Sequence, residues 1–176
     1  MWENLHLFTF LQNNMQTKQE IEDWYKIPDR WQYFQSEEDA KRREIILGML
    51  PKTYNNALDI GAGECFIAQK LPAQNIYGIE WSDTAASRFP ENVTRIDQPR
   101  CDTSYDLVVT TGTLYPQYDH KQIYGWILES ASEHILVAGI REWIIDYNFN
   151  FCRTLNRVEF TYLNFTQVVT LYEVIK

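Results

Sequence analysis

The feature that most constrains the fold is a glycine turn that follows a short apolar run. Ala57-Leu58-Asp59-Ile60 leads into Gly61-Ala62-Gly63, and the segment 64–71 then predicts a helix that ends before Pro72. A strand, a glycine turn and a helix in this order form the opening unit of a doubly wound α/β sheet. Ligands of such sheets lie beyond the carboxyl ends of the strands, so this turn is the first place to look for a function.

The rest of the chain repeats the alternation of short apolar runs and helical segments. Two alternating runs, 158–163 and 168–175, are separated by four residues and predict an antiparallel hairpin. The expected fold is α/β: a Rossmann-like, mainly parallel seven-stranded sheet with helices on both faces and a C-terminal antiparallel hairpin. The other predicted strands are 76–79, 92–96, 105–110 and 135–140. Two more helices are predicted: one starts at Ser82 and is ended by Pro90, and the other runs from Asp119 to Ser132.

The first 50 residues are polar and aromatic, and their pattern is mostly helical. Ser36 followed by three acids predicts a helix start, and the apolar residues after it predict a helix that stops at Pro51. A chain of 176 residues is long enough for one domain with its own core. We therefore expect residues 1–50 to form a helical cap or lid of the same domain, and residues 51–176 to form its core.

Composition excludes several classes of protein. With 16 Lys+Arg against 24 Asp+Glu, the formal charge is −8, which disfavours nucleic acid as a partner. Cys65, Cys101 and Cys152 are odd in number and widely spaced, as suits a reducing compartment. The sequence has no apolar stretch of membrane-spanning length, no signal-peptide pattern and no metal-ligand spacing. We expect a cytoplasmic protein without a bound metal; its oligomeric state is left open.

Two carboxylates indicate what the glycine turn binds. Glu80 ends the next predicted strand, 21 residues after Asp59, where a carboxylate accepts hydrogen bonds from both hydroxyls of a ribose. The third glycine of a dinucleotide fingerprint is replaced by Phe66, and Glu64 would oppose a pyrophosphate. A nicotinamide-dependent oxidoreductase is therefore disfavoured, and an adenosine ligand with a positively charged part is favoured.

These residues resemble a known family. Leu58-Asp59-Ile60-Gly61-Ala62-Gly63 is similar to the first motif of class I S-adenosylmethionine-dependent methyltransferases, and Tyr105-Asp106-Leu107-Val108-Val109 is similar to their fourth-strand motif. In detail the chain resembles the nodulation N-methyltransferase group at Asp29-Arg30-Trp31, at 92–99 and at Leu114-Tyr115. The resemblance implies S-adenosylmethionine as cofactor, S-adenosylhomocysteine as product, and no metal.

Each candidate site residue has an expected role. Trp81 would cover the adenine, the resemblance places Asp97 at the adenine amino group, and Thr111 and Gly112 follow the strand that passes the sulfonium. His120 is a candidate base for a hydroxyl acceptor, and Tyr115 a candidate for positioning the acceptor. The basic run 41–43 is expected to be a solvated helix face. The expected cofactor-binding residues are Trp31, Asp59, Gly61, Gly63, Glu80, Trp81, Asp97, Thr111 and Gly112. The expected aromatic wall of the acceptor pocket is Trp24, Tyr25, Trp31, Tyr33, Tyr115, Tyr118, Trp143 and Tyr147.

The function predicted from the sequence is methyl transfer to a small-molecule acceptor, with an amine nitrogen favoured because no convincing base is present. The cofactor carries the reactivity, so the protein has mainly to orient and desolvate the reactants. One alternative stays open, a non-catalytic module that binds the same cofactor for regulation or assembly.

Overall fold

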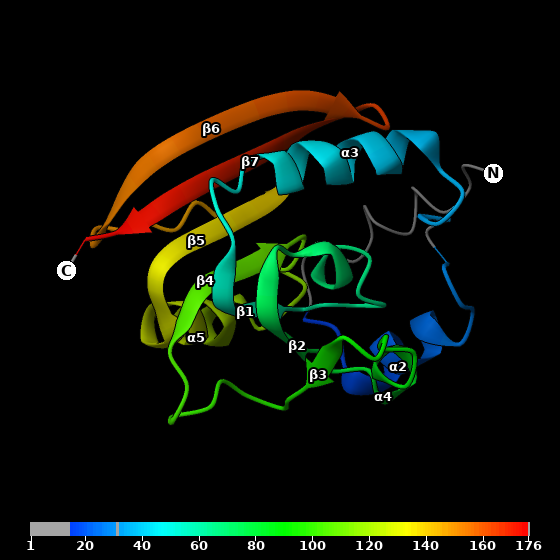
Figure 1. The fold of residues 1–176 in the computed structure, drawn as a ribbon. Coiled ribbons are helices and arrows are strands. Elements are labelled where there is room, and N and C mark those ends of the chain that lie inside the picture. Colours follow the sequence, from blue (N-terminus) through cyan, green and yellow to red (C-terminus); the bar gives the residue numbers. More distant parts are fainter. Residues whose placement is uncertain (1–14, 31, 176) are drawn as a thin grey trace.

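A seven-stranded sheet forms the centre of the computed structural model, which describes residues 15–30 and 32–175 (Figure 1). The strand order is β3-β2-β1-β4-β5-β7-β6; β1 to β5 are parallel, and β7 runs antiparallel between β5 and β6. The strands are β1 (Tyr54–Ile60), β2 (Ala73–Ile79), β3 (Val93–Arg95), β4 (Tyr105–Thr111), β5 (Ala131–Ile140), β6 (Cys152–Tyr162) and β7 (Phe165–Val174). The predicted fold class is confirmed.

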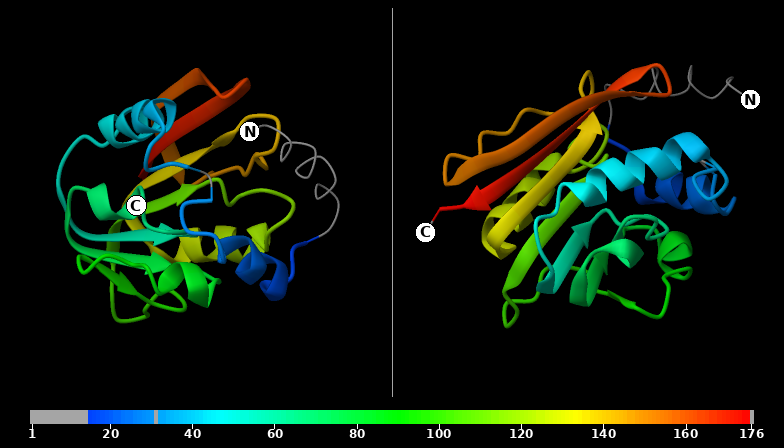
Figure 2. Two further views of the ribbon diagram at one scale, coloured as in Figure 1. Left: turned by 90° about the vertical axis from the view of Figure 1, so that its right-hand side faces the viewer. Right: turned by 45° about the horizontal axis from the view of Figure 1, so that its top comes forward.

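Helices lie on both faces of the sheet. Figure 2 shows α3 along one face and α5 along the other, while α2 lies beside the short α4 near β3. The helices are α2 (Lys18–Tyr25), α3 (Glu37–Gly48), α4 (Asp83–Ala86) and α5 (His120–Ser130), with a 3-10 turn η1 (Ala68–Lys70). Side chains bonded to backbone N–H groups start the helices: Thr17, Ser36, Ser82 and Asp119.

Alternation along the strands divides the core into two layers. Leu107 and Val109 of β4 face the layer that contains Ile46 of α3, whereas Val108 faces the layer that contains Ile123 and Ile127 of α5. Successive side chains of a strand point to opposite faces, so one apolar strand supplies both layers. Burial on both faces explains why the central strands read as continuous apolar runs.

Two local predictions are wrong. The segment 64–71 is not a helix; it turns repeatedly and contains only η1, because Cys65 has φ +63°, which an α-helix does not allow. The hairpin connection has two residues instead of four: Leu163 and Asn164 both have positive φ, the backbone of a tight turn. Of the N-terminal segment, residues 1–14 and Trp31 lie outside the described residues.

Helix α2 is fastened to α4 by one carboxylate. Glu22 accepts hydrogen bonds from the backbone N–H of Asp83 at 2.6 Å, from that of Thr84 at 3.1 Å and from the Ser82 hydroxyl at 2.9 Å. These hydrogen bonds lower the pKa of Glu22 to about 2, and the largest contribution comes from Thr84, followed by Asp83 and Ser82. Lys18 adds an ion pair of 2.9 Å to the Asp83 side chain. This attachment holds the N-terminal segment over the carboxyl edge of the sheet.

Replacing Glu22 tests this attachment. Because its folded-state pKa is below the ordinary value of 4.5, its contribution is present above pH 4.5 and is lost as the pH falls towards 2. We expect Glu22→Gln to increase hydrogen exchange of the α4 amides at neutral pH, and wild-type protein to show the same increase as the pH falls through that range. Asp23→Asn, on the same helix but paired only within it, is the control. Equal exchange in the two variants would contradict the role of Glu22.

Candidate functional site

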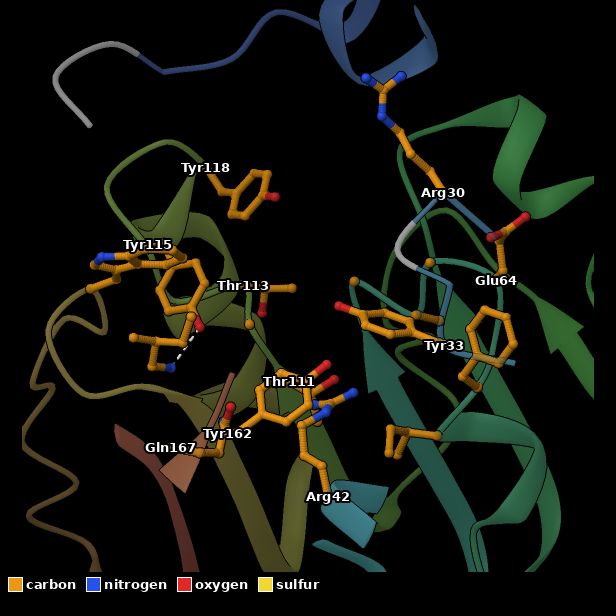
Figure 3. A pocket seen from close by; sticks show the side chains of 18 of the residues that line it. Arg30, Tyr33, Arg42, Glu64, Thr111, Thr113, Tyr115, Tyr118, Tyr162 and Gln167 are labelled. Atoms are coloured by element: carbon orange, nitrogen blue, oxygen red, sulfur yellow. Dashed lines mark hydrogen bonds between the residues drawn. The ribbon is translucent and has the colours of Figure 1, made fainter. Parts of the chain in front are cut away.

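A cavity of about 440 Å³ lies at the carboxyl ends of the parallel strands (Figure 3). Its walls come from the ends of β1, β2, β4 and β5, from the segment 21–42 and from the β6-β7 hairpin. The volume is in the range of small-molecule sites. Among the sequence-predicted residues, the cavity brings together Gly61, Gly63, Glu80, Trp81, Thr111, Gly112 and Tyr115.

The glycine turn needs glycine for two separate reasons. Gly61 and Gly63 have φ +77° and +56°, a backbone region that side chains disfavour. A Cβ on Gly61 would lie 2.1 Å from Cγ2 of Thr113. The turn is fixed to β2 because the N–H groups of Gly61 and Ala62 both donate to the carbonyl oxygen of Ile79, at 2.8 and 2.9 Å. Backbone is therefore exposed to the cavity where a ligand can approach closely.

Glu80 lies at the end of β2 and holds this turn. Its Oε2 accepts from the Gly63 N–H at 2.8 Å, and its Oε1 accepts from the Ser82 N–H at 2.8 Å. Burial raises the pKa of Glu80, and these backbone hydrogen bonds oppose the rise. Each carboxylate oxygen has a further acceptor site, so Glu80 can still bind two hydroxyls of a ligand. Trp81 beside it also lines the cavity and stacks on Trp126, with ring centroids 6.3 Å apart.

Asp59 lies behind the turn and does not line the cavity. Its side chain is buried, and Oδ1 has no hydrogen-bond donor in the described structure. Burial, and then the negative charge of Glu80, raise the pKa of Asp59 to about 7. Two neighbouring buried carboxylates are stabilised in their ionised form by a positive charge. The turn is thus electrostatically suited to a cationic ligand.

The opposite wall is formed by the loop after β4. Gly112 has φ +74°, and Thr111, Gly112 and Tyr115 face the cavity. The Tyr115 oxygen accepts a hydrogen bond from the Ile140 N–H at 2.7 Å (Figure 3). Burial raises the pKa of both Tyr115 and Tyr118, so both hydroxyls keep their protons and can donate a hydrogen bond to a ligand.

Besides Asp59, two predicted site residues of the described chain do not line the cavity. His120 does not line it; Nδ1 of His120 lies 2.5 Å from the hydroxyl of Tyr147. Asp97 is exposed in the turn after β3 and is also outside the cavity wall. Trp31 lies outside the described residues. The roles given to these three residues stay predictions.

Glu64 has a structural partner that the sequence did not reveal. It forms an ion pair with Arg88 at 2.7 Å and accepts from the Asp29 N–H at 2.8 Å. Arg88 also donates to the carbonyl oxygen of Tyr25 at 2.8 Å. Glu64 therefore ties the N-terminal segment to the glycine turn, with its charge compensated.

Sequence reasoning missed the part of the site formed by α3 and the hairpin. Arg42 lines the cavity together with Tyr162 and Gln167 (Figure 3). The side chains of Arg42 and Arg43 are only 10% and 19% exposed, so the expectation of a solvated basic face is wrong for both. The available signal was the helical spacing of Asp39, Arg42, Arg43 and Ile46, which places them on one side of α3. Of the predicted aromatic wall, the residues that line the cavity are Tyr25, Tyr33, Tyr115, Tyr118 and Trp143.

Over residues 15–30 and 32–175, no group of three His, Cys, Asp or Glu residues is arranged to hold a metal ion. In the same part of the chain, no helix has the length and apolar character needed to span a membrane.

Comparisons with known proteins connect this geometry to a fold family. No protein-family model matches the sequence, and no curated protein matches it. Solved structures do match. N-methyltransferase NodS from Bradyrhizobium japonicum WM9, in complex with S-adenosylhomocysteine, is 14% identical with a TM-score of 0.75, covering 90% of this chain and 98% of its own.

Two further structures are similar over nearly their whole length. The putative methyltransferase in complex with the Trm112 activator from Haloferax volcanii is 12% identical, with a TM-score of 0.69, and covers 92% of this chain and 98% of that one. Magnesium protoporphyrin IX methyltransferase from Synechocystis PCC 6803, with bound S-adenosylmethionine, is 11% identical, with a TM-score of 0.65, and covers 91% and 98%. At these identities the likeness shows the fold: this chain has the Rossmann-like fold of class I methyltransferases.

Proposed function

We propose that this protein is an S-adenosylmethionine-dependent methyltransferase that acts on the amine nitrogen of a small molecule. The observation that carries the proposal is the glycine turn held by Glu80 inside a cavity at the carboxyl edge of the sheet. The proposal is supported by the three similar structures, each of which is of a methyltransferase. The unpaired Cys65, Cys101 and Cys152 suit a cytoplasmic location.

The residues of the first and second strands would bind the cofactor. Glu80 would accept hydrogen bonds from the ribose hydroxyls, Trp81 would cover the adenine, and the backbone at Gly61 and Gly63 would lie against the methionine part. The negative charges of Asp59 and Glu80 would favour binding of the positively charged sulfonium of the cofactor. From the resemblance, Asp97 and Trp31 are proposed to complete this site. When bound, the cofactor supplies an activated methyl group on a sulfonium.

The acceptor would enter from the side of the N-terminal cap, residues 1–50, which we propose belongs to the same domain. Its nitrogen lone pair would form the new carbon–nitrogen bond as the carbon–sulfur bond breaks and its electron pair stays on sulfur, and the methylated amine would release its proton to water. Tyr115 would donate a hydrogen bond that orients the acceptor, which is the main contribution required. No histidine of the described chain lines the cavity, which favours nitrogen over a hydroxyl that needs a base.

Ligand binding and transfer are tested separately. S-adenosylhomocysteine at 100 times its dissociation constant should stabilise the protein by about 2.7 kcal/mol, and NAD should not stabilise it. A labelled-methyl screen over amines, hydroxylated small molecules and peptides should label an amine. Binding without transfer to any acceptor would favour the non-catalytic module. Stabilisation by NAD alone would refute the proposal.

Glu80→Gln tests the ribose contact. Losing charge-assisted hydrogen bonds should weaken binding of S-adenosylhomocysteine by about 10- to 100-fold in calorimetry. Wild-type protein should prefer S-adenosylhomocysteine to its 2′-deoxy analogue, and the variant should lose most of that preference. Exposed Glu91→Gln is the control. A variant that keeps the full preference would show that Glu80 does not bind the ribose.

Asp59→Asn tests the electrostatic role of the turn. Because the pKa of Asp59 is raised from its ordinary value of 3.8 to about 7 in the folded protein, its cost to stability grows from about pH 4 and is fully present above pH 7. The variant should be more stable than wild type at pH 8 by about 2–4 kcal/mol in urea unfolding, and the gain should shrink as the pH falls from 7 towards 4. It should also bind S-adenosylmethionine more weakly at pH 8.

The exposed pair of Arg100 and Asp102 provides the control for this measurement. Asp102→Asn should show no comparable gain at pH 8, because hydrogen bonding to Arg100 lowers the pKa of that carboxyl. A gain for Asp59→Asn that does not change with pH would contradict the assignment.

A further inference from the structure

A buried cluster of charged residues lies at the first turns of α3, where the cap meets the C-terminal hairpin. Asp39 is fully buried, and the side chains of Arg42 and Arg43 are 10% and 19% exposed. Two guanidinium groups share one carboxylate, so the cluster has an uncompensated positive charge. Removing a charge from water to this extent costs free energy unless the charge is paired with an opposite one.

The contacts of Asp39 show which arginine is left without full compensation. Oδ1 of Asp39 accepts from Nε of Arg42 at 2.6 Å and from the Tyr162 hydroxyl at 3.2 Å, while Nε of Arg43 lies 3.0 Å from Oδ2. Arg43 has other partners as well: Nη2 donates to the carbonyl oxygen of Tyr33 at 3.1 Å, and its guanidinium lies 5.7 Å from the Phe66 ring centre. These contacts give Arg43 partners besides Asp39, and Arg43 itself does not line the cavity.

Arg42 instead presents its terminal nitrogens to the cavity. Only its Nε is hydrogen-bonded within the part of the chain that the structure describes, and its guanidinium lies between the rings of Tyr33 and Tyr162, 5.3 Å from each ring centre. Figure 3 shows it pointing into the cavity near Thr111. Tyrosine rings and the bond to Asp39 fix the guanidinium plane, and two N–H groups stay available for a planar anion.

Arg42 lies on the side of the cavity that is opposite the glycine turn, where the methyl acceptor would bind. In Figure 3, Arg30 and Glu64 lie on the side of the glycine turn, and Arg42 lies across the cavity from them, beside the hairpin. A second hollow of about 390 Å³ between α3 and the hairpin shares Arg42 and Tyr162 with the cavity. Arg42 thus lies between the cavity and the second hollow, through which a small molecule could enter from solvent.

We propose that Arg42 binds a carboxylate of the acceptor, so that the substrate is a small amine that also carries a carboxylate, as an amino acid does. This inference rests on the proposed function, because it presupposes that the cavity holds a methyl acceptor. The net positive charge of Asp39, Arg42 and Arg43 matches a monovalent carboxylate. Glu38 lines the same wall but is exposed to solvent, where its charge is screened. A phosphate dianion would leave one negative charge unpaired in a cavity that already contains the Glu80 carboxylate, whereas Glu64 there is paired with Arg88.

The test compares matched acceptors on the protein saturated with S-adenosylhomocysteine. Amino acids, their amides and the corresponding amines without the carboxyl group are titrated by calorimetry, and the same compounds are used in labelled-methyl transfer. We expect some amino acids to bind about 10- to 100-fold more tightly than their amides, and to be methylated with a lower KM. Arg42→Gln should remove this preference, and Arg42→Lys should keep only part of it.

Arg43→Gln is the matched control, because it removes a partner of the same Asp39 at a residue that does not itself line the cavity; it should keep the preference. Thermal unfolding checks that each variant folds, and Arg42→Lys decides the test if Arg42→Gln does not fold. Affinity for S-adenosylhomocysteine should be unchanged in all variants.

Three results would overturn the inference. The first is a wild-type protein with no preference for carboxylates, and the second is a preference that survives in both Arg42 variants. The third is a loss of S-adenosylhomocysteine affinity in Arg42→Gln without a loss for 5′-methylthioadenosine, which would mean that Arg42 binds the methionine carboxylate instead. Failure of the proposed function is distinct, since it appears in wild-type protein as absent cofactor binding or absent transfer.

Discussion

The hydrogen bonds of the Glu80 carboxylate are the interaction on which the site depends. They join two backbone segments that are distant in sequence, the glycine turn at Gly63 and the start of α4 at Ser82. Parallel pairing of β1 and β2 brings both segments to the same edge of the sheet. The N-terminal segment is then attached to the two ends of this bridge, by Glu22 at α4 and by the Glu64–Arg88 pair at the turn. The glycine turn, the start of α4 and the described N-terminal segment are therefore one connected structure.

Charge is distributed unevenly in the cavity, and burial gives this distribution its effect. Glu80, with Asp59 behind it, makes the strand end electronegative, while Arg42 makes the far wall electropositive. Under the proposed function, the electronegative region would attract the cationic sulfonium and the electropositive region would attract an anionic group of the acceptor. Exposed charges elsewhere on the chain are screened by solvent and contribute little to such selection.

Much of the fold and the first half of the site could be predicted from local pattern. The apolar run before Gly61, the second strand before Glu80 and the helix starts at Ser36 and Asp119 are encoded within a few residues each, and the structure has them. The helix at 64–71 could not be excluded in this way, because its pattern is helical and the left-handed backbone at Cys65 is imposed by the turn around it. The hairpin strands were predicted, but not that their turn would close the cavity.

The sequence by itself determined the order of strands and helices, the glycine turn and the carboxylate that faces it, because these depend on residue spacing and on the topology of parallel sheets. Only the tertiary structure decided which charges are paired and which face the cavity. Arg42 and Arg43 are neighbours with the same chemistry, yet one lines the cavity and the other contacts Tyr33 and Phe66. That difference arises from the packing of α3 against the hairpin, which joins residues more than 100 positions apart.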